Sequence, residues 1–282
     1  MGTYECFEVE AADHVAHLRL SRPDELNTMT PAFWRELPEI VDGISDDASA
    51  RVIVLSSSGR HFTAGMDLAV FTSPSSVTGD GDAEEGRQRA NVRLAARRLQ
   101  DSFNALERAR MPVIAAVQGG CVGGGVDMVS ACDLRYATTD AWFCIQEINI
   151  GMTADLGTLQ RLPKLIPPGV VRELAYTGRR MPAQRAYEVG LVNGLFDSHD
   201  DLVDGALETA AEIAARTPLG IWGTKEMLNY ARDHSVEDGL NYIATWQTGM
   251  FHPSDLLEGI TAQAEKRDPE YDDLLPAPKG ID

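Results

Sequence analysis

The sequence is poor in the features that hold small secreted or zinc-binding proteins together. Its 282 residues include four cysteines, none of them in CxxC spacing: Cys6, Cys121, Cys132 and Cys144. No apolar leader precedes the opening residues, and the chain does not end in the peroxisomal tripeptide SKL. These absences argue against a disulfide framework and a zinc ribbon, and they lead us to expect a reducing, cytoplasmic location.

Long apolar runs and positive charge are also scarce. The apolar runs are strand-sized and fall short of the roughly 20 residues that a membrane helix needs. Lysine and arginine number 25 against 43 aspartates and glutamates, which gives a formal net charge of −18. Because nucleic acids and anionic lipids bind clustered cations, this balance argues against a nucleic-acid or membrane partner. A ligand that carries phosphate would need a local basic pocket.

The motifs of several large enzyme classes are missing as well. The chain has neither the GxGxxG dinucleotide fingerprint nor the GxxxxGK[ST] phosphate loop. Its six histidines form no HxxxH or HExxH pair, and no GxSxG nucleophile elbow occurs. The segment from residue 80 begins like a calcium loop, but its glycine falls at position 7 rather than 6, and Asn91 stands where the loop needs glutamate. We therefore expect no metal site.

What the sequence does contain is an alternation of apolar strands and amphipathic helices. With 44% hydrophobic residues, the chain can bury the core of one large domain, alone or with a helical appendage. The expected strands are a hairpin that turns through Ala11–Asp13 and ends at Pro23, two continuous apolar runs at 51–59 and 111–119, and two short strands within 133–147. Continuous apolar strands are typical of a sheet that is buried on both faces.

Helices are expected between and after these strands. The first helix follows Thr30, a suitable cap, with Pro31 in its first turn, and a basic amphipathic helix covers about 87–109. The segment 72–86 has no periodicity and is expected to be a loop. Beyond about residue 200 the pattern is mostly helical, so the whole predicts an α/β core with a helical C-terminal part.

Two glycine turns offer backbone donors. Gly123–Gly125 follow the apolar run 111–119 and precede an apolar helix. A helix N-terminus presents unpaired N–H groups to negative charge, and glycines let a ligand approach the backbone. In HFTAGMDL, a turn at Ala64–Gly65 exposes a second donor, the N–H of Met66. Two such donors can hold one carbonyl oxygen in an oxyanion hole, unless both turns serve only packing.

Three carboxylates occur in apolar settings. Asp127 lies two residues beyond the triple glycine, and Glu147 and Asp155 flank the span INIGMTA. Because an unpaired charge is costly to bury, each should be paired, protonated or functional. An apolar pocket raises the pKa of a carboxyl group towards the range useful for proton transfer. For each acid alone, a helix cap or a salt bridge is an equal alternative, and Asp155 could cap the helix that begins near LGTLQRL.

The motifs FTAGMDL and GGCVGGGVDMVSACDLRYA resemble those of the crotonase (enoyl-CoA hydratase/isomerase) superfamily, and the likeness covers about residues 5–265. The resemblance implies a spiral of repeated ββα units over 1–200, which holds the acyl-CoA site. It also implies a helical region over 201–282 that forms a homotrimer, or a hexamer as a dimer of trimers, and closes the site. In that family the thioester oxygen lies between two N–H groups that match Met66 and Gly124.

The acids indicate a branch of the superfamily. Hydratases carry two glutamates that activate water; the first matches Asp127, so that pair is altered, and the second matches Glu147. Together with Asp155, ADLGTLQRLPK and RDHSVEDGLNYIATW, the acids resemble those of the delta-3,5-delta-2,4-dienoyl-CoA isomerases. There, two acids on opposite sides of the dienoyl chain move protons between carbon 2 and carbon 6. By this likeness Glu147 and Asp155 are the shuttle pair, Asp127 supports the site, and no cofactor is required, since coenzyme A is part of the substrate.

The resemblance also implies where the substrate binds. Backbone around the first glycine turn and before the helix is expected to hold the acyl-CoA, namely Ala64, Gly65, Asp67, Leu68 and Gly123. Arg60, Lys225 and Lys266 are candidates for the CoA phosphates, each with an ordinary surface charge as the alternative. Two other functions stay open: a hydratase in which Asp127 and Glu147 share a water, and a catalytically silent protein that binds acyl-CoA.

Overall fold

A computed structural model describes residues 3–67, 69–72, 84–251, 253–278 and 280 of the chain. Most of the segment 72–86, expected to be a loop, and the candidate binding residue Leu68 lie outside these ranges.

A six-stranded sheet forms the centre of the molecule, in the order β1-β2-β3-β4-β6-β9. β1 and β2 form an antiparallel hairpin, and every other neighbouring pair is parallel. The strands are β1 (Phe7–Ala12), β2 (Val15–Leu20), β3 (Val52–Ser57), β4 (Val113–Val117), β6 (Leu134–Thr138) and β9 (Gly194–Phe196). The hairpin turns at Asp13 and His14, slightly later than expected, and both adopt positive φ angles, of 49° and 64°. β3 and β4 confirm the predicted apolar runs and are buried along their whole length.

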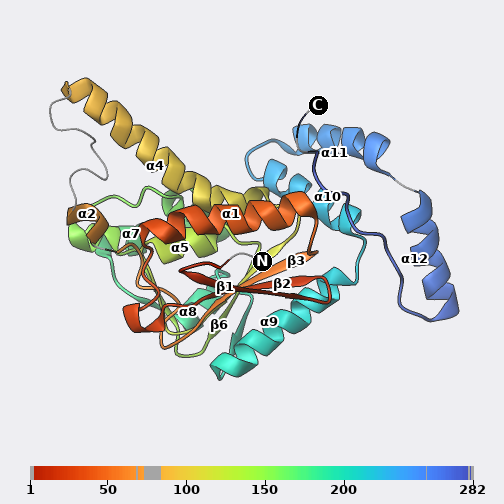
Figure 1. Ribbon diagram of the computed structural model, residues 1–282, viewed down its shortest axis with the longest axis horizontal. Coiled ribbons are helices and arrows are strands. Elements are labelled where there is room, and N and C mark those ends of the chain that lie inside the picture. The colour runs from red at the N-terminus through yellow and green to blue at the C-terminus, as the bar shows by residue number, and fades with distance from the viewer. Residues whose placement is uncertain (1–2, 68, 73–83, 252, 279, 281–282) are drawn as a thin grey trace.

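Helices cover both faces of this sheet, which explains the buried central strands. α1 (Pro31–Asp47) and α4 (Glu85–Arg108) lie on one side, and α9 (His199–Ala214) lies on the other (Figure 1). Thr30 occupies the N-cap of α1 as expected, but its side chain caps nothing, because the hydroxyl pairs with Cys6 Sγ at 3.4 Å.

The middle of the chain repeats a strand-strand-helix unit. β4 leads into β5 (Gly120–Val122) and α5 (Gly124–Ser130); β6 leads into β7 (Trp142–Cys144), the 3-10 helix η2 (Glu147–Ile150) and α6 (Thr158–Leu165). β5 and β7 belong to a second sheet of order β5-β7-β8. This arrangement confirms the expected ββα units. The remaining short elements are η1 (Pro23–Glu25), α2 (Ala69–Thr72), α7 (Pro168–Thr177), β8 (Met181–Pro182) and α8 (Ala183–Glu188).

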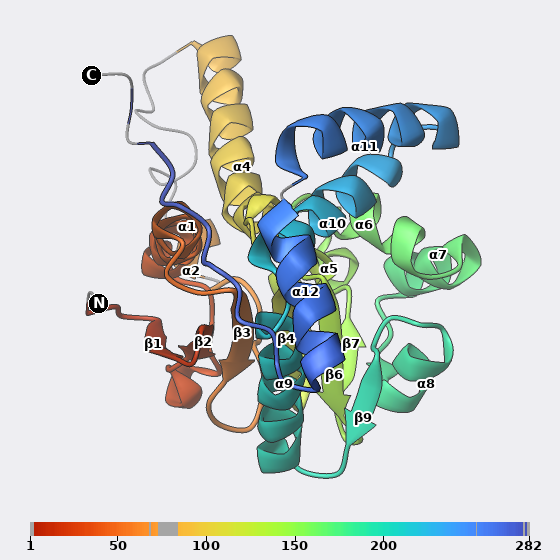
Figure 2. The same cartoon turned by 90° about the vertical axis from the view of Figure 1, so that its right-hand side faces the viewer.

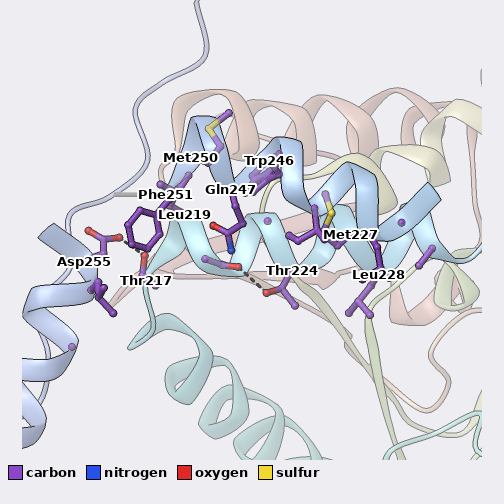
Figure 3. Close-up of a pocket in the computed structure, with 18 of the residues that line it drawn as sticks. Thr217, Leu219, Thr224, Met227, Leu228, Trp246, Gln247, Met250, Phe251 and Asp255 are labelled. Carbon is purple, nitrogen blue, oxygen red and sulfur yellow. Dashed lines mark hydrogen bonds between the residues drawn. The ribbon is translucent and has the colours of Figure 1, made fainter. Parts of the chain in front are cut away.

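The last helices form a separate layer beyond the sheet. These are α10 (Pro218–Ala231), α11 (Val236–Met250) and α12 (Pro253–Glu265), with α12 at the right-hand edge of Figure 1 and facing the viewer in Figure 2. A cavity of about 810 Å³ lies between the three helices and is lined mainly by apolar side chains such as Met227, Leu228, Trp246 and Phe251 (Figure 3). None of the helices that the structure describes has the length and apolar character that a bilayer span needs.

The C-terminal tail returns from α12 to the core. Arg51 Nη2 donates to the carbonyl of Tyr271 at 2.6 Å, Arg110 Nη1 donates to the carbonyl of Leu275 at 2.9 Å, and the N–H of Ala277 donates to a carbonyl of α1 at 2.6 Å. α9, by contrast, packs its buried alanines directly on the sheet. The expected division at residue 200 stays a prediction.

Candidate active site

The two glycine turns found in the sequence lie side by side. The N–H of Thr63 donates to the carbonyl of Gly120, and the N–H of Val122 donates back to the carbonyl of Thr63, each at 3.1 Å. Gly65 has a φ of +87°, and a Cβ atom there would lie 2.7 Å from the carbonyl oxygen of Val122. Only glycine fits this turn, because a side chain would both strain the backbone and push the two segments apart.

Two backbone donors emerge where these turns meet. Met66 forms a parallel bridge with Met29, in which the N–H of Met29 donates to Gly65 O and the N–H of Asp67 donates to Met29 O. This pattern directs the N–H of Met66 away from Met29. Gly124 is the first residue of α5, so its N–H has no partner within the helix. Among the described residues neither N–H donates to a protein acceptor.

The glycines of the second turn allow the start of α5 to lie close to Glu147. Gly123 has a φ of +53°, and a Cβ atom there would lie 3.3 Å from Glu147 Oε1. A Cβ atom at Gly124 would lie 2.9 Å from Met29 Sδ, and one at Gly65 would lie 3.5 Å from the nitrogen of Gly124. The two donors and the Glu147 carboxylate therefore share one small region, as an oxyanion hole beside a base would require.

Asp127 is fully buried one turn into α5. Its Oδ1 accepts a hydrogen bond from the N–H of Thr158 at 2.6 Å, whereas its Oδ2 has no partner in the described part of the chain. Burial raises the pKa of Asp127 to about 6, and the hydrogen bonds from Thr158 oppose that rise. Thr158 is the first residue of α6, so Asp127 accepts the backbone N–H at the start of this helix. The sequence suggested Asp155 for that capping role.

Glu147 opens η2 with a mostly buried side chain. Burial is the largest cause that raises its pKa to about 7, and the negative charge of Asp127 adds to it. Its Oε2 is buried and, within the described residues, lacks a hydrogen-bond partner. Such a carboxylate can take up a proton near neutral pH.

Asp155 stands more open than the other two acids. Its residue surface is exposed, yet partial desolvation raises the pKa of its carboxyl group. Its charge also raises the pKa values of Asp127 and Glu147, so the three acids belong to one electrostatic cluster. In the described ranges, no group of three or more His, Cys, Asp or Glu side chains is placed to hold a metal ion.

The other candidate residues divide into three groups. Ala64 donates its N–H to the carbonyl of Leu26, and the Asp67 carboxylate accepts from the N–H at the start of α2. Arg60 is exposed close to the turns, and Lys266 is exposed after α12. Lys225, a candidate for the CoA phosphates with an ordinary surface charge as the alternative, is instead buried: Nζ pairs with Asp133 at 2.8 Å and donates to two backbone carbonyls.

Sequence reasoning missed the residues that hold the segment around Asp155. Gln100 Nε2 donates to the carbonyl of Asp155 at 2.7 Å, and Arg161 Nη1 donates to the carbonyl of Leu156 at 3.3 Å. The sequence carries no signal for this role, because Arg161 follows Gln160 in a mixed polar and apolar helix that also contains Lys164.

Comparison with known proteins gives a consistent family assignment. Residues 10–274 match the sequence model of the family described as enoyl-CoA hydratase/isomerase. The chain is 44% identical to the human mitochondrial delta(3,5)-delta(2,4)-dienoyl-CoA isomerase, over 94% of this chain and 81% of that protein. It is 39% identical to the peroxisomal delta(3,5)-delta(2,4)-dienoyl-CoA isomerase of Arabidopsis thaliana, over 96% of this chain and 98% of that one.

Solved structures share the fold. The crystal structure of an enoyl-CoA hydratase from Bacillus anthracis superposes with a TM-score of 0.84 and 33% identity, and it covers 95% of this chain and 99% of that chain.

The names of the relatives correct one expectation. We expected a cytoplasmic location because no targeting signal was apparent, but the human relative is named mitochondrial and the Arabidopsis relative peroxisomal. The cytoplasmic prediction is therefore wrong.

The fold prediction, in contrast, is confirmed. The ββα units, the paired glycine turns and the match over most of the sequence agree with one another. The chain belongs to the enoyl-CoA hydratase/isomerase family, whose members have the crotonase fold.

Proposed function

We propose that this protein isomerises 3,5-dienoyl-CoA to 2,4-dienoyl-CoA in fatty-acid β-oxidation. The observation that carries the proposal is the cluster of Asp127, Glu147 and Asp155 together with the Met66 and Gly124 N–H groups, which are unpaired among the described residues. Relatives of 44% and 39% identity bear the name of this activity.

The reaction moves one proton and changes no oxidation state. A base removes a proton from carbon 2, the electron pair passes into a conjugated enolate, and an acid returns a proton to carbon 6. The N–H groups of Met66 and Gly124 hold the negative thioester oxygen; removal of one such donor typically costs about 10²- to 10³-fold in rate. No electron acceptor or metal is needed for this step, and coenzyme A enters as part of the substrate.

Glu147 and Asp155 are the proton-transfer pair. Both carboxyl groups have a raised pKa through desolvation, as a group that must gain and lose protons near neutral pH requires. Asp127 supports them: it fixes the start of α6 through Thr158, and its charge helps raise the pKa of Glu147. The backbone around Ala64, Gly65, Asp67 and Gly123 lies at the donors and holds the acyl-CoA.

A direct absorbance assay tests the activity. The purified protein is mixed with a 3,5-dienoyl-CoA, and the ultraviolet absorbance of the conjugated 2,4-dienoyl thioester is followed. Glu147→Gln and Asp155→Asn should each lower kcat by about 10²- to 10⁴-fold. Glu208→Gln, an exposed glutamate on α9, is the matched control and should leave kcat unchanged. No absorbance rise, with water addition to 2-enoyl-CoA instead, would refute the isomerase in favour of a hydratase, and thioester binding without turnover would favour the silent binding protein.

The protein acts as a homo-oligomer formed through its last three helices. Several large apolar side chains there are more than half exposed, among them Leu228, Val236, Leu240, Leu257 and Ile260. Apolar surface on this scale marks an interaction site in a protein of this kind, and the cavity of Figure 3 lies within the same layer. A second copy of the chain covers this surface in a trimer or a hexamer.

Sedimentation measures this assembly directly. The wild type should show a molar mass three or six times the 30.7 kDa of the chain. Leu240→Asp should dissociate it, because a charge replaces an exposed apolar side chain, whereas Asn241→Asp, on the next residue of α11, should not. A monomeric wild type would rule the assembly out.

A further inference from the structure

The segment that carries Asp155 is held by its backbone rather than by its side chain. Among the described residues, no other side chain hydrogen-bonds to the Asp155 carboxylate, so the backbone decides where that carboxylate lies. Three nearby peptide groups are fixed from three helices. Gln100 of α4 donates to Asp155 O, Arg161 of α6 donates to Leu156 O, and Asp127 of α5 accepts from Thr158 N.

Arg161 lies directly beneath this turn. Its residue surface is only 8% exposed, and Gly157, with a φ of +135°, wraps so closely around it that a Cβ atom there would lie 1.8 Å from Arg161 Nη1. The turn can therefore take this shape only while glycine occupies position 157, and the guanidinium fills the space beneath it.

One face of α4 in turn fixes Arg161. Gln100, Asn104 and Glu107 are spaced four and three residues apart, so they lie on the same side of the helix, and we call them the α4 polar face. Arg161 Nη2 donates to Asn104 Oδ1 at 2.6 Å and to Glu107 Oε2 at 2.7 Å, and Nε donates to Glu107 Oε2 at 3.1 Å. A planar guanidinium can make these contacts and reach Leu156 at once, whereas a single ammonium group cannot.

Glu107 stays charged in this position. Burial alone would raise its pKa, but the hydrogen bonds and charges of Arg161 and Arg232 outweigh burial and hold the pKa below its usual value. Arg232, the residue that follows α10, pairs with the other oxygen of the carboxylate, and among the described residues no hydrogen bond joins it to the Asp155 turn.

We propose that Arg161, held by the α4 polar face, is a positioning residue that places the Asp155 carboxylate for proton transfer. The proposal rests on the isomerase function proposed above and deepens it. A displacement of about 1 Å can cost roughly 10²-fold in rate, because proton transfer requires the acid and the carbon to be in near-contact geometry.

The test compares Arg161→Lys with Arg232→Lys in the dienoyl-CoA assay. Arg161→Lys should lower kcat by roughly 10- to 100-fold and leave KM within about twofold, since the CoA contacts are elsewhere. Arg232→Lys removes the same chemical group from the same glutamate and should leave both constants within about twofold. Equal losses in the two variants, or an Arg161→Lys enzyme with wild-type kcat, would overturn the proposal.

A double mutant separates positioning from general loss of stability. In the Asp155→Asn background, Arg161→Lys should cause little further loss, because residues that act through one group are not additive. A full additional loss would show that Arg161 acts on the fold and not through Asp155.

Hydrogen exchange tests the positioning role of Arg161 independently of the proposed isomerase activity. Arg161→Lys should speed exchange in peptides that cover 154–160 and leave those that cover 145–150 unchanged. If the wild type lacks isomerase activity, the proposed function fails, and exchange still shows whether Arg161 holds the turn. If the wild type is active and exchange is unchanged, only the positioning proposal fails.

Discussion

Gly65→Ala should disable the enzyme while leaving it folded. Gly65 precedes the donor Met66, adopts a φ of +87°, and would bring a Cβ atom to 2.7 Å from the backbone oxygen of Val122. Because neither backbone can yield without breaking the bridge between the two turns, the peptide that carries the Met66 N–H must rotate or shift. In the proposed oxyanion hole, the thioester oxygen would then lose one of its two donors.

Gly190→Ala is a control that separates backbone strain from the displacement of the Met66 N–H. Gly190 has nearly the same backbone angle, a φ of +84°, but no heavy atom of the described residues lies within 4 Å of the position that a Cβ atom would take there. A left-handed alanine costs about 1–2 kcal/mol at either position. For a chain of this size, such a cost corresponds to a fall in Tm of roughly 2–8 °C. Only Gly65→Ala should also lose about 10²- to 10³-fold in kcat, the usual effect of a lost oxyanion donor.

Thermal unfolding and the dienoyl-CoA absorbance assay together measure both effects. The expected result is a loss of Tm in both variants, larger in Gly65→Ala because its Cβ atom also displaces the Val122 backbone, and a large loss of kcat in Gly65→Ala alone. A Gly65→Ala enzyme with kcat within about threefold of wild type would refute the assignment of Met66 as an oxyanion donor.

Three further predictions concern buried charges. The charge of Asp127 raises the pKa of Glu147, so Asp127→Asn should lower that pKa. In a plot of kcat/KM against pH, the midpoint of the rising limb, expected near pH 7 in wild type, should therefore move to lower pH. An upward shift or no shift would contradict this coupling. The raised pKa of Glu147 contributes stability that is present at low pH and lost as pH rises through about 7. Between about pH 5 and about pH 8, urea unfolding should therefore show that wild type loses more stability than Glu147→Gln, by on the order of 3 kcal/mol. Equal losses in the two proteins would contradict the raised pKa. Lys225→Met should lower the free energy of unfolding in denaturant by about 3–5 kcal/mol, because Asp133 loses its buried partner. The KM for acyl-CoA should stay unchanged. A stable variant with a raised KM would instead support a role of Lys225 in binding the CoA phosphates.

The sequence was sufficient to predict features that depend on local pattern. The runs that became β3 and β4, the glycine turns and the helix that became α4 all follow from apolar periodicity and turn chemistry. The three acids were also visible, because carboxylates are rare in apolar segments.

Features that depend on tertiary partners could not be predicted in this way. Thr30 has the right identity and place for a helix cap, yet Cys6 from a distant strand region takes its hydroxyl. Asp127 rather than Asp155 meets the start of α6, because α5 and α6 pack together. Lys225 resembles any surface lysine in the sequence, and only the fold shows the carbonyls and the carboxylate that surround it.

The C-terminal tail restrains the last helices in addition to their contacts with one another. Arg51 and Arg110 bind the tail beyond α12, and Thr217 at the start of α10 donates to Asp255 in the first turn of α12, so this helix is held near both of its ends. A helix held in this way loses conformational entropy during folding, before the association proposed above takes place. The apolar layer of α10–α12 is thus preorganised, and association should lose less affinity to ordering than a free C-terminal arm would.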